Sequence, residues 1–329
     1  MPADTDVRAL IVPQPGGADV LEVRSVPRPQ PGPGQLVVQV QASGVNFKDV
    51  YMREGIYPAA MPLPLGDECA GQVLEVGEGV TDFAVGDVVA TAKAPAGAHA
   101  EVVVLDAAGT VAVPEGVDAE IAAAAMLQGM TAHYLVHATY MVGQDEIVLV
   151  HAAAGGVGAL LVQMAKAQGA QVIATVGSEA KVAVARDAGA DHVLRTDVSE
   201  DLAAEVRAIA PDGVDVVYDG VGKDTFEASL RSLHKRGLLA LFGASSGQVP
   251  PFDLQRLNPL GSLFVTRPTL ADYVANPEEL RERAGDLFAA IADGTLTIAI
   301  GGRYPLAEAR RAYDDLEGRR TTGKLLLVP

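Results

Sequence analysis

Short apolar runs alternate with helical segments through the second half of the chain, and this alternation limits the fold more than any other feature. One run, Ile147–Val150, is continuously apolar, as expected for a strand that is covered on both faces. Further strands are expected at residues 171–175, 192–194, 214–218, 238–242 and 262–265, with helices at 158–168, 179–188, 200–209 and 225–233. Strands and helices alternating at this spacing predict an α/β fold with a doubly wound, parallel sheet.

The first part of the chain has a different pattern. Residues 7–125 contain short alternating runs separated by turn clusters, which predicts a β-rich region. An alanine-rich segment without proline, 119–140, is expected to be helical. After Leu270 the alternation stops, and two helical stretches and a final strand at 324–328 are expected. With 329 residues the chain exceeds the roughly 250–300 residues at which single cores stop growing, so two domains are expected.

Charge and composition exclude several classes of function. The 25 Lys and Arg residues against 42 Asp and Glu residues give a net charge of −17, which repels phosphate backbones, so no nucleic-acid partner is expected. No apolar run approaches the roughly 20 residues of a membrane span. The acidic start, residues 1–6, lacks the features of a signal peptide, and the single cysteine, Cys69, is expected to be a buried small apolar residue. We therefore expect a cytoplasmic protein.

The strongest chemical signal is the segment His151–Gly158, which reads HAAAGGVG. It follows a strand directly and precedes a helix directly, the context of a Rossmann dinucleotide-binding loop. Gly155 lets the backbone approach a pyrophosphate, and Gly158 lets the helix pack on the strand, while the helix N-terminus offers N–H groups to phosphates. Ala153 stands where the motif has its first glycine. The alternative interpretation is a tight turn that binds no ligand.

The end of the second strand of this region favours NADPH over NADH. A site for NADH usually places a carboxylate there to bind the ribose 2′-hydroxyl. In this chain the strand ends in Val176-Gly177-Ser178, and the first acid is Glu179. Lys181 and Arg195 lie nearby in the sequence and suit a 2′-phosphate. The alternative is that both are ordinary surface charges.

Six stretches together resemble the NADPH:quinone oxidoreductases of the zinc-free medium-chain dehydrogenase/reductase branch, the group that includes zeta-crystallin. They are residues 44–49, 66–68, 151–158, 175–177, 242–247 and 261–268. The resemblance implies a GroES-like substrate domain formed by residues 1–125 and 268–329. It also implies a Rossmann NADPH-binding domain at 126–267, and a homodimer or homotetramer.

The resemblance also implies site residues. Asn46 and Tyr51 are the expected catalytic residues, with Tyr51 either a proton donor or only a wall of the pocket. Zinc-dependent relatives have a Cys in place of Asn46 and a His in place of Asp67, so no metal is expected. With Gly158 and Ser178 added from the loop and the strand end, the expected NADPH contacts are Asn46, Gly155, Gly156, Val157, Gly158, Gly177, Ser178, Lys181, Arg195, Phe242, Ser245, Ser246 and Lys324.

These features predict an enzyme that transfers hydride from NADPH to a quinone or a related electron-poor carbonyl or alkene without zinc. One alternative is a reductase of enoyl thioesters or alkenals, with the same cofactor and a different acceptor. An alternative of another class is an NADPH-binding sensor, or an RNA-binding protein similar to zeta-crystallin, although the charge of −17 argues against RNA.

Overall fold

The structure, a computed structural model, describes residues 6–329, so five of the six residues in the acidic N-terminal segment lie outside the described part. The chain falls into two compact units. The first unit consists of Met1–Leu127, Val274–Gly294 and Ile298–Pro329, and the second of Gln128–Tyr273 and Thr295–Thr297. The first division therefore falls inside helix α2 (Ala119–Tyr134). The assignment of substrate to one unit and NADPH to the other remains a prediction.

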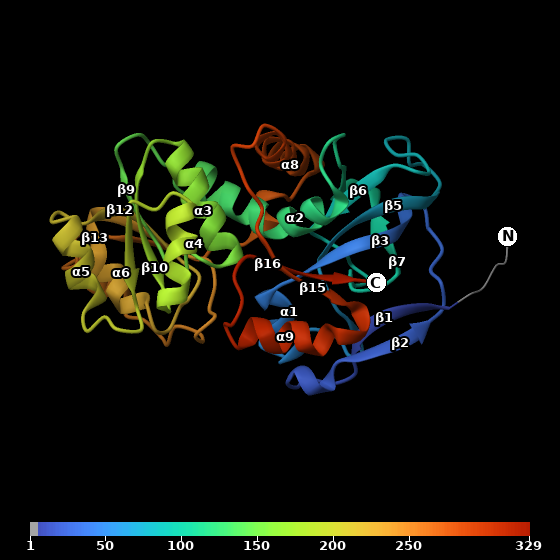
Figure 1. The fold of residues 1–329 in the computed structure, drawn as a ribbon, viewed down its shortest axis with the longest axis horizontal. Helices are drawn as coiled ribbons and strands as arrows, with labels where there is room; N and C mark the ends of the chain where they lie inside the picture. The colour runs from blue at the N-terminus through green and yellow to red at the C-terminus, as the bar shows by residue number, and fades with distance from the viewer. Residues whose placement is uncertain (1–5) are drawn as a thin grey trace. The chain divides into compact units, whose positions relative to one another are not determined.

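The second unit is built on a parallel sheet of six strands in the order β11-β10-β9-β12-β13-β14. Helices α3 and α4 cover one face of the sheet and α5 and α6 the other (Figure 1). This strand order is that of the Rossmann fold and confirms the predicted fold class. The elements are β9 (Ile147–Val150), α3 (Gly156–Ala167), β10 (Gln171–Val176), α4 (Val182–Asp187), β11 (His192–Arg195), α5 (Leu202–Ile209), β12 (Val214–Asp219), α6 (Phe226–Ser232), β13 (Leu233–Leu241) and β14 (Phe264–Thr266).

The central strands of this sheet are apolar because both of their faces are covered. Val148, Leu149 and Val150 of β9 are fully buried. Leu149 belongs to an apolar cluster that also contains Val217 of β12 and Leu239 of β13. The continuous apolar run of β9 therefore reflects burial of the strand on both faces, as the sequence predicted.

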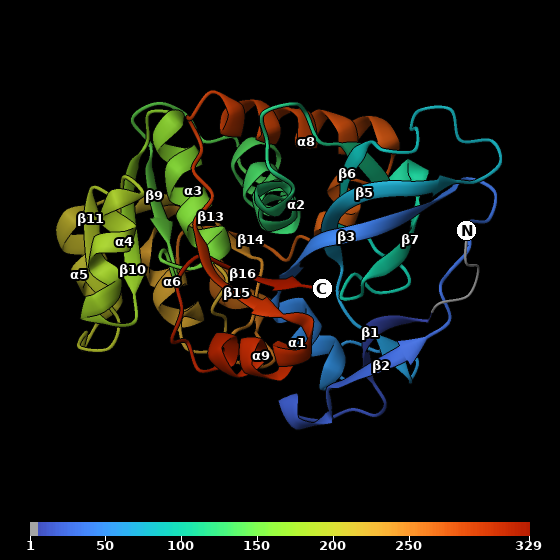
Figure 2. The same cartoon turned by 45° about the vertical axis from the view of Figure 1, so that its right-hand side comes forward.

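The first unit is a β-rich, GroES-like assembly. Its larger sheet has the order β15-β16-β3-β5-β6-β8, with β7 also paired to β3, and its smaller sheet has the order β2-β1-β4. Helices α1 and α9 lie side by side (Figures 1 and 2). The elements are β1 (Val7–Val12), β2 (Glu22–Val26), β3 (Gln35–Val45), α1 (Phe47–Arg53), β4 (Leu63–Pro64), β5 (Glu68–Val76), β6 (Val88–Thr91), β7 (Val102–Asp106), β8 (Thr110–Ala112), α8 (Pro277–Ala292), β15 (Ile300–Pro305), α9 (Ala309–Glu317) and β16 (Lys324–Val328).

One expectation about the elements is confirmed and another is wrong. The segment expected to be helical, 119–140, is helical to Thr139, as an α-helix to Tyr134 and then as a π-helical turn, Leu135–Thr139. The region after Leu270 contains a third short helix, α7 (Leu270–Tyr273), and an unexpected strand, β15. Strand β15 was missed because its Gly301 and Gly302 lower strand propensity. Glycine is needed at residue 301 because a Cβ there would overlap the Thr322 carbonyl oxygen.

The helices and the single cysteine bear on two further expectations from the sequence. None of the helices within residues 6–329 has the length and apolar character needed to cross a membrane. Cys69 is fully buried in the core of the first unit, which confirms its role as a small apolar residue. Burial raises the pKa of the Cys69 thiol to about 12, so the side chain stays protonated and unreactive.

Candidate functional site

The glycine-rich loop of the second unit lies at the carboxyl end of β9, directly before α3. Ala152 has a φ of 51°, so the left-handed residue of the turn is Ala152 and not the neighbouring Ala153, which stands at the first glycine position of the motif. Ala153 is buried, and its N–H donates to the Thr175 carbonyl of β10 at 2.9 Å. The missing first glycine therefore does not disturb the turn, although a left-handed alanine costs conformational energy.

The loop requires glycine at the start of α3. A Cβ on Gly158 would overlap the Ala152 carbonyl oxygen, so this glycine allows α3 to pack closely on the loop. A Cβ on Gly155 would lie 3.1 Å from the same oxygen, a tight but adjustable contact. The first turn of α3 also leaves the N–H groups of Gly156, Val157 and Gly158 without partners inside the helix. These groups form a cradle for an anion at the positive end of the helix dipole.

A buried polar network stands behind the loop. His151, the last residue before the turn, is 1% exposed. Its Nδ1 lies 2.9 Å from the Thr175 hydroxyl and its Nε2 lies 3.0 Å from the Ser229 hydroxyl, which in turn lies 2.8 Å from Asp219 Oδ2. Burial lowers the pKa of His151, and the nearby Asp219 only partly opposes this effect. The network joins the carboxyl ends of β9, β10 and β12 beneath the glycine-rich loop.

The end of β10 is open, as an approaching ligand would require. Gly177 is exposed, and a Cβ placed on it would meet only the Thr196 hydroxyl oxygen, at 3.9 Å. The fold of this unit therefore does not itself demand glycine at residue 177, and its small size leaves space for a ligand. Ser178 follows in extended conformation before Glu179–Lys181, a short 3-10 helix that carries Lys181. The carboxylate of Glu179 is bound by Arg195 at 2.7 Å.

Arg195 is more constrained than the sequence indicated. At the end of β11 its guanidinium pairs with Glu179 and, through two nitrogens at 2.7 and 3.1 Å, with Asp197. The hydrogen bonds that Arg195 donates to Asp197, and then the charges of Asp197 and Glu179, raise the pKa of Arg195. A 2′-phosphate would have to compete with two carboxylates for this guanidinium. Arg195 is therefore a weaker candidate for this phosphate than its position after β11 indicated.

The remaining predicted cofactor contacts of this unit follow β13. Phe242 packs so closely on Gly220 that a Cβ on the glycine would lie 2.8 Å from the ring. The Ser246 hydroxyl donates to the Val221 carbonyl at 2.8 Å and accepts from the Asp224 N–H, while Ser245 lies beside it on the same loop. All strands of this sheet are parallel, so these residues, the glycine-rich loop and Gly177 lie at one edge, where open α/β sheets bind ligands.

The first unit gathers a second set of predicted residues. Lys324 of β16 and Glu68 of β5, 1% and 0% exposed, form a buried ion pair through Lys324 Nζ and Glu68 Oε1. Asn46 lies between them, since its amide nitrogen donates to Glu68 at 2.6 Å and its oxygen accepts from Lys324 at 2.7 Å. The Leu127 N–H donates to the other Glu68 oxygen at 2.7 Å. Gly44 permits this packing, because a Cβ there would overlap Glu68 and Lys324.

This arrangement limits which hydrogen bonds Asn46 and Lys324 could still form with a ligand. Both amide N–H groups of Asn46 are engaged, one by Glu68 and one by the Gly44 carbonyl at 3.1 Å. Asn46 therefore has only oxygen lone-pair capacity left for a ligand. Lys324 Nζ has three N–H donors, of which Asn46 and Glu68 take two. The ammonium group is thus a fixed charge, and removing either member of the pair would leave the other buried and poorly compensated.

Tyr51 lies on α1, beyond Asn46, and belongs to an aromatic cluster. Its ring packs edge-on against Tyr57 with centroids 5.3 Å apart, and the Phe47 ring lies 6.4 Å away. Tyr51 is partly exposed. Tyr57 was missed because the sequence 54–60 reads only as a loop without a regular period. The three rings are inclined to one another, so a planar ring could stack on a single one of them rather than on a shared flat surface.

The positions that hold zinc in zinc-dependent relatives contain different chemistry here. Asp67 pairs with Lys48 at 2.9 Å, while burial and then the Asp49 charge raise the pKa of Asp67 against the opposing effect of Lys48. The Glu68 carboxylate forms an ion pair with the Lys324 ammonium group. Within residues 6–329, no three His, Cys, Asp or Glu side chains gather in a way that could hold a metal ion.

One further residue near the cofactor loop escaped the sequence-based prediction. The side-chain amide of Gln128 lies against the first turn of α3, where a Cβ on Gly156 would overlap it. Gln128 comes from the alanine-rich helix α2 and is partly buried. The neighbouring sequence does not indicate that Gln128 lies close to the glycine-rich loop, because this proximity to Gly156 arises only when α2 and α3 pack together.

The fold and these two sets of residues define a two-unit oxidoreductase of the medium-chain type. A family model for the alcohol dehydrogenase GroES-like domain matches residues 32–142, and a model for zinc-binding dehydrogenases matches residues 156–289. The quinone oxidoreductase of Pseudomonas aeruginosa is 47% identical over 317 residues, which cover 95% of this chain and 97% of that protein. A 2-haloacrylate reductase from a Burkholderia species is 41% identical, covering 98% of this chain and 99% of that protein.

Solved structures agree with these relationships. The structure of the Escherichia coli quinone oxidoreductase complexed with NADPH matches with a TM-score of 0.96 and 41% identity, covering 98% of this chain and 100% of that chain. The chain therefore belongs to the quinone oxidoreductase family, within the zinc-free branch of the medium-chain dehydrogenases/reductases.

Proposed function

We propose that this protein is an NADPH-dependent, zinc-independent reductase of quinones and related electron-poor acceptors. The observation that carries the proposal is the carboxyl edge of the parallel sheet. This edge carries a helix N-terminus, the open Gly177 and the segment with Lys181, and the two acids there, Glu179 and Asp197, are both bound by Arg195. This arrangement suits a dinucleotide with a 2′-phosphate better than one with a free 2′-hydroxyl.

The predicted cofactor contacts of the second unit have defined tasks in this proposal, while the other two, Asn46 and Lys324, lie in the first unit. The N–H groups of Gly156, Val157 and Gly158 bind the pyrophosphate, and Gly155 allows it to approach the loop. Lys181, with Ser178 and a smaller contribution from Arg195, binds the 2′-phosphate. Phe242, Ser245 and Ser246 line the continuation of the same edge. When bound, NADPH supplies the hydride, and the protein contributes orientation and charge.

The acceptor is assigned to the first unit. An acceptor that takes up a hydride gains negative charge on oxygen, and a donor from the protein stabilises this charge. The buried Lys324 ammonium group is paired with Glu68 and donates to the Asn46 oxygen at 2.7 Å, and we assign its third N–H donor to the acceptor oxygen. Tyr51 stacks on the acceptor as a wall, or donates the proton that completes the reduction. Orientation is expected to provide most of the acceleration.

A second candidate acceptor is an activated alkene. The 2-haloacrylate reductase relative, 41% identical over nearly the whole chain, favours it. The hydride donor is the same, but an alkene needs a proton on carbon, whereas a reduced quinone is already a stabilised anion. An alkene reductase would therefore depend more strongly on the Tyr51 hydroxyl than a quinone reductase would.

We further propose that the protein forms a homodimer through β14. This strand lies at the edge of the parallel sheet, so one side of it has no partner strand within residues 6–329. Phe264 and Val265 of this strand are 59% and 36% exposed, and the nearby Leu254 is 69% exposed. A second copy that paired with this edge would cover the apolar side chains and satisfy the backbone groups. A cytoplasmic location remains a prediction from the sequence.

The direct test is a fluorescence titration with NADPH and NADH followed by mixing with 1,4-benzoquinone or with 2-chloroacrylate. Clear preference for NADPH and rapid oxidation by benzoquinone support the proposal. Oxidation by the haloacrylate alone identifies the alkene reductase. Tight NADPH binding without oxidation by either acceptor indicates a sensor, and absence of NADPH binding overturns the proposal.

A further inference from the structure

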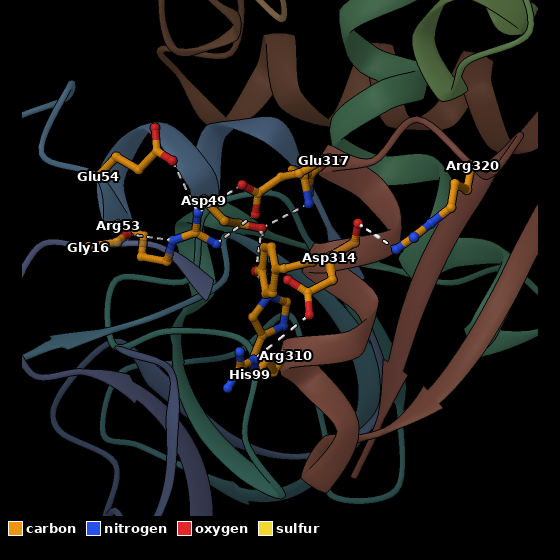
Figure 3. Close-up of polar contacts among 11 residues, drawn as sticks. Gly16, Asp49, Arg53, Glu54, His99, Arg310, Asp314, Glu317 and Arg320 are labelled. Carbon is orange, nitrogen blue, oxygen red and sulfur yellow. Dashed lines mark hydrogen bonds and ion pairs between the residues drawn. The ribbon is translucent and has the colours of Figure 1, made fainter. Parts of the chain in front are cut away.

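A chain of four buried polar side chains runs through the first unit next to α1. It begins at Ser43 of β3, whose hydroxyl lies 2.8 Å from His99 Nδ1. His99 Nε2 lies 2.9 Å from the hydroxyl of Tyr313 on α9, and this hydroxyl donates to Asp49 Oδ2 on α1 at 2.9 Å. All four residues are at most 1% exposed. Figure 3 shows His99 and Asp49 at two points of this chain, which we call the α1 relay.

The hydrogen bonds of the α1 relay can run in only one direction when Asp49 is a carboxylate and the His99 imidazole carries a single proton. The Tyr313 hydroxyl has one proton, and it gives this proton to Asp49. It must therefore accept from His99, which places the imidazole proton on Nε2. The free Nδ1 then accepts from the Ser43 hydroxyl. Every donor in the relay points toward the carboxylate, so each member fixes the orientation of the next.

The relay ends on the residue that holds the start of α1. Asp49 Oδ2 accepts the Asn46 N–H at 2.8 Å as well as the Tyr313 hydroxyl. Asp49 thereby fixes the backbone of Asn46, whose side chain contacts Lys324 and Glu68. The other Asp49 oxygen is buried without a hydrogen-bond partner in the described part of the chain. The orientation of this carboxylate therefore depends on the Asn46 N–H and the Tyr313 hydroxyl.

The opposite end of α1 is bound to the same helix, α9. Arg53 is fully buried, and its guanidinium holds both carboxylate oxygens of Glu317 at 2.8 and 3.1 Å and the Gly16 carbonyl at 3.0 Å (Figure 3). The same guanidinium lies 5.8 Å from the centre of the Tyr313 ring. Helix α1 has only seven residues, too few to be stable alone in water. Helix α9 therefore fixes α1 at both ends.

We propose that Tyr313 and His99 are positioning residues for the reduction, because they orient α1 and with it Asn46 and Tyr51. This inference rests on the proposed function. Neither residue touches the acceptor or the cofactor in this proposal, and both act through Asp49. Loss of the relay would therefore lower the rate of hydride transfer more than it lowers NADPH affinity, because most of the predicted NADPH contacts lie in the second unit.

The test compares Tyr313→Phe with Tyr304→Phe. Tyr304 is a matched control, because it lies in the same unit, is 9% exposed, and donates to Asp315 Oδ2 at 2.9 Å. Each variant removes one tyrosine hydroxyl that donates a hydrogen bond to a carboxylate, but only the carboxylate bound by Tyr313, that of Asp49, belongs to α1. We expect Y313F to lower the single-turnover rate of NADPH oxidation by benzoquinone at least tenfold and to raise the NADPH Kd by a clearly smaller factor. Y304F should leave both values within twofold.

A second pair of variants tests His99. Glutamine places an amide nitrogen near the position of His99 Nε2 and can still donate to Tyr313, whereas asparagine is too short. H99Q should therefore keep a higher single-turnover rate than H99N. Equal rates for H99Q and H99N, or a Y313F rate equal to that of Y304F in folded protein, would overturn the inference.

Hydrogen exchange separates this inference from the proposed function. Amides of residues 47–53 should exchange at least tenfold faster in Y313F than in wild type, and at the wild-type rate in Y304F. This readout needs no acceptor. Turnover by the wild-type protein tests the proposed function, whereas unchanged exchange in α1 of Y313F contradicts the relay even if no acceptor is ever found.

Discussion

Replacing Gly158 by alanine is expected to separate the glycine-rich loop from α3. A Cβ on Gly158 would overlap the Ala152 carbonyl oxygen and lie 2.9 Å from both the Ala152 carbonyl carbon and Ala153 Cα. These are backbone atoms, so no change of rotamer relieves the overlap. Carbon atoms pack best at about 3.5–4.0 Å, so the first turn of α3 has to move by roughly 0.5 Å or more.

This displacement affects both stability and binding. Overpacking of this kind costs about 1–3 kcal/mol of folding free energy. The shift also moves the N–H groups that we propose bind the pyrophosphate. A hydrogen bond to a charged group contributes about 1.5–3 kcal/mol, so losing one weakens NADPH binding by roughly 10- to 100-fold.

The assay is a titration of NADPH fluorescence, combined with calorimetry of the same protein. Gly285→Ala is the control, because no atom lies within 4 Å of a Cβ placed on this residue inside α8. G285A should bind NADPH like wild type and gain up to about 1 kcal/mol of stability from helix propensity. A folded G158A protein whose NADPH Kd stays within twofold of wild type would refute the assignment of this loop to the pyrophosphate.

Three further predictions concern the cofactor phosphate, the thiol and the buried histidine. Lys181→Gln should lower the preference for NADPH over NADH by about tenfold or more in fluorescence titrations, and Arg195→Gln should lower it less, because Glu179 and Asp197 already bind that guanidinium. A larger effect of the arginine variant would reverse this ranking. Cys69, with burial raising its thiol pKa to about 12, should resist a disulfide reagent at pH 8 in the native protein and react on unfolding in guanidinium. Rapid native labelling would show that the thiol is accessible. Because burial lowers the pKa of His151 below the usual 6.5, the unfolded state takes up this proton first as the pH falls. Stability from His151 is therefore fully present above about pH 6.5 and decreases below it, by at most about 1.4 kcal/mol per pH unit. In urea unfolding between pH 7 and pH 5, His151→Gln should show a shallower loss of stability than wild type, and equal slopes would contradict this argument.

The sequence predicted the parallel sheet well because the cause of each strand is local. A run such as Ile147–Val150 is apolar on both faces because both faces of the strand are covered. The glycines of the following loop permit close contacts with residues only a few positions away. The π-helical turn after Tyr134 was not predictable in the same way. Its residues, 135–139, have an ordinary helical composition, and only the packing of the folded unit selects the wider turn.

The polar contacts of the first unit were less predictable, because their partners lie far apart in the sequence. Lys324 was expected to approach the cofactor, and its partnership with Glu68 joins residues 256 positions apart. Tyr313 and Asp49 are separated by 264 positions. No spacing rule connects such residues, because the separation is set by strand order in the sheet and by the return of the C-terminal segment as α9 and β16.

Each unit contains a series of buried side chains that are hydrogen-bonded to one another, and the chemical groups follow the same order in both series. Thr175, His151, Ser229 and Asp219 form a hydroxyl–imidazole–hydroxyl–carboxylate series in the second unit, and the α1 relay repeats this order in the first. An imidazole with one proton donates on one side and accepts on the other, so it transmits a single orientation through a buried region. Each series ends beside a segment to which we assign ligand binding.

This arrangement has an energetic consequence. Removing one member of such a series leaves its neighbours without a hydrogen-bond partner in a buried region. Each unsatisfied polar group there costs about 1–3 kcal/mol of folding free energy. Removing a second member of the same series then costs little more, because its partner is already lost. Losses in different series should add, since they lie in different units. We therefore expect the two series to act as independent supports, one for the glycine-rich loop and one for the helix that carries Asn46 and Tyr51.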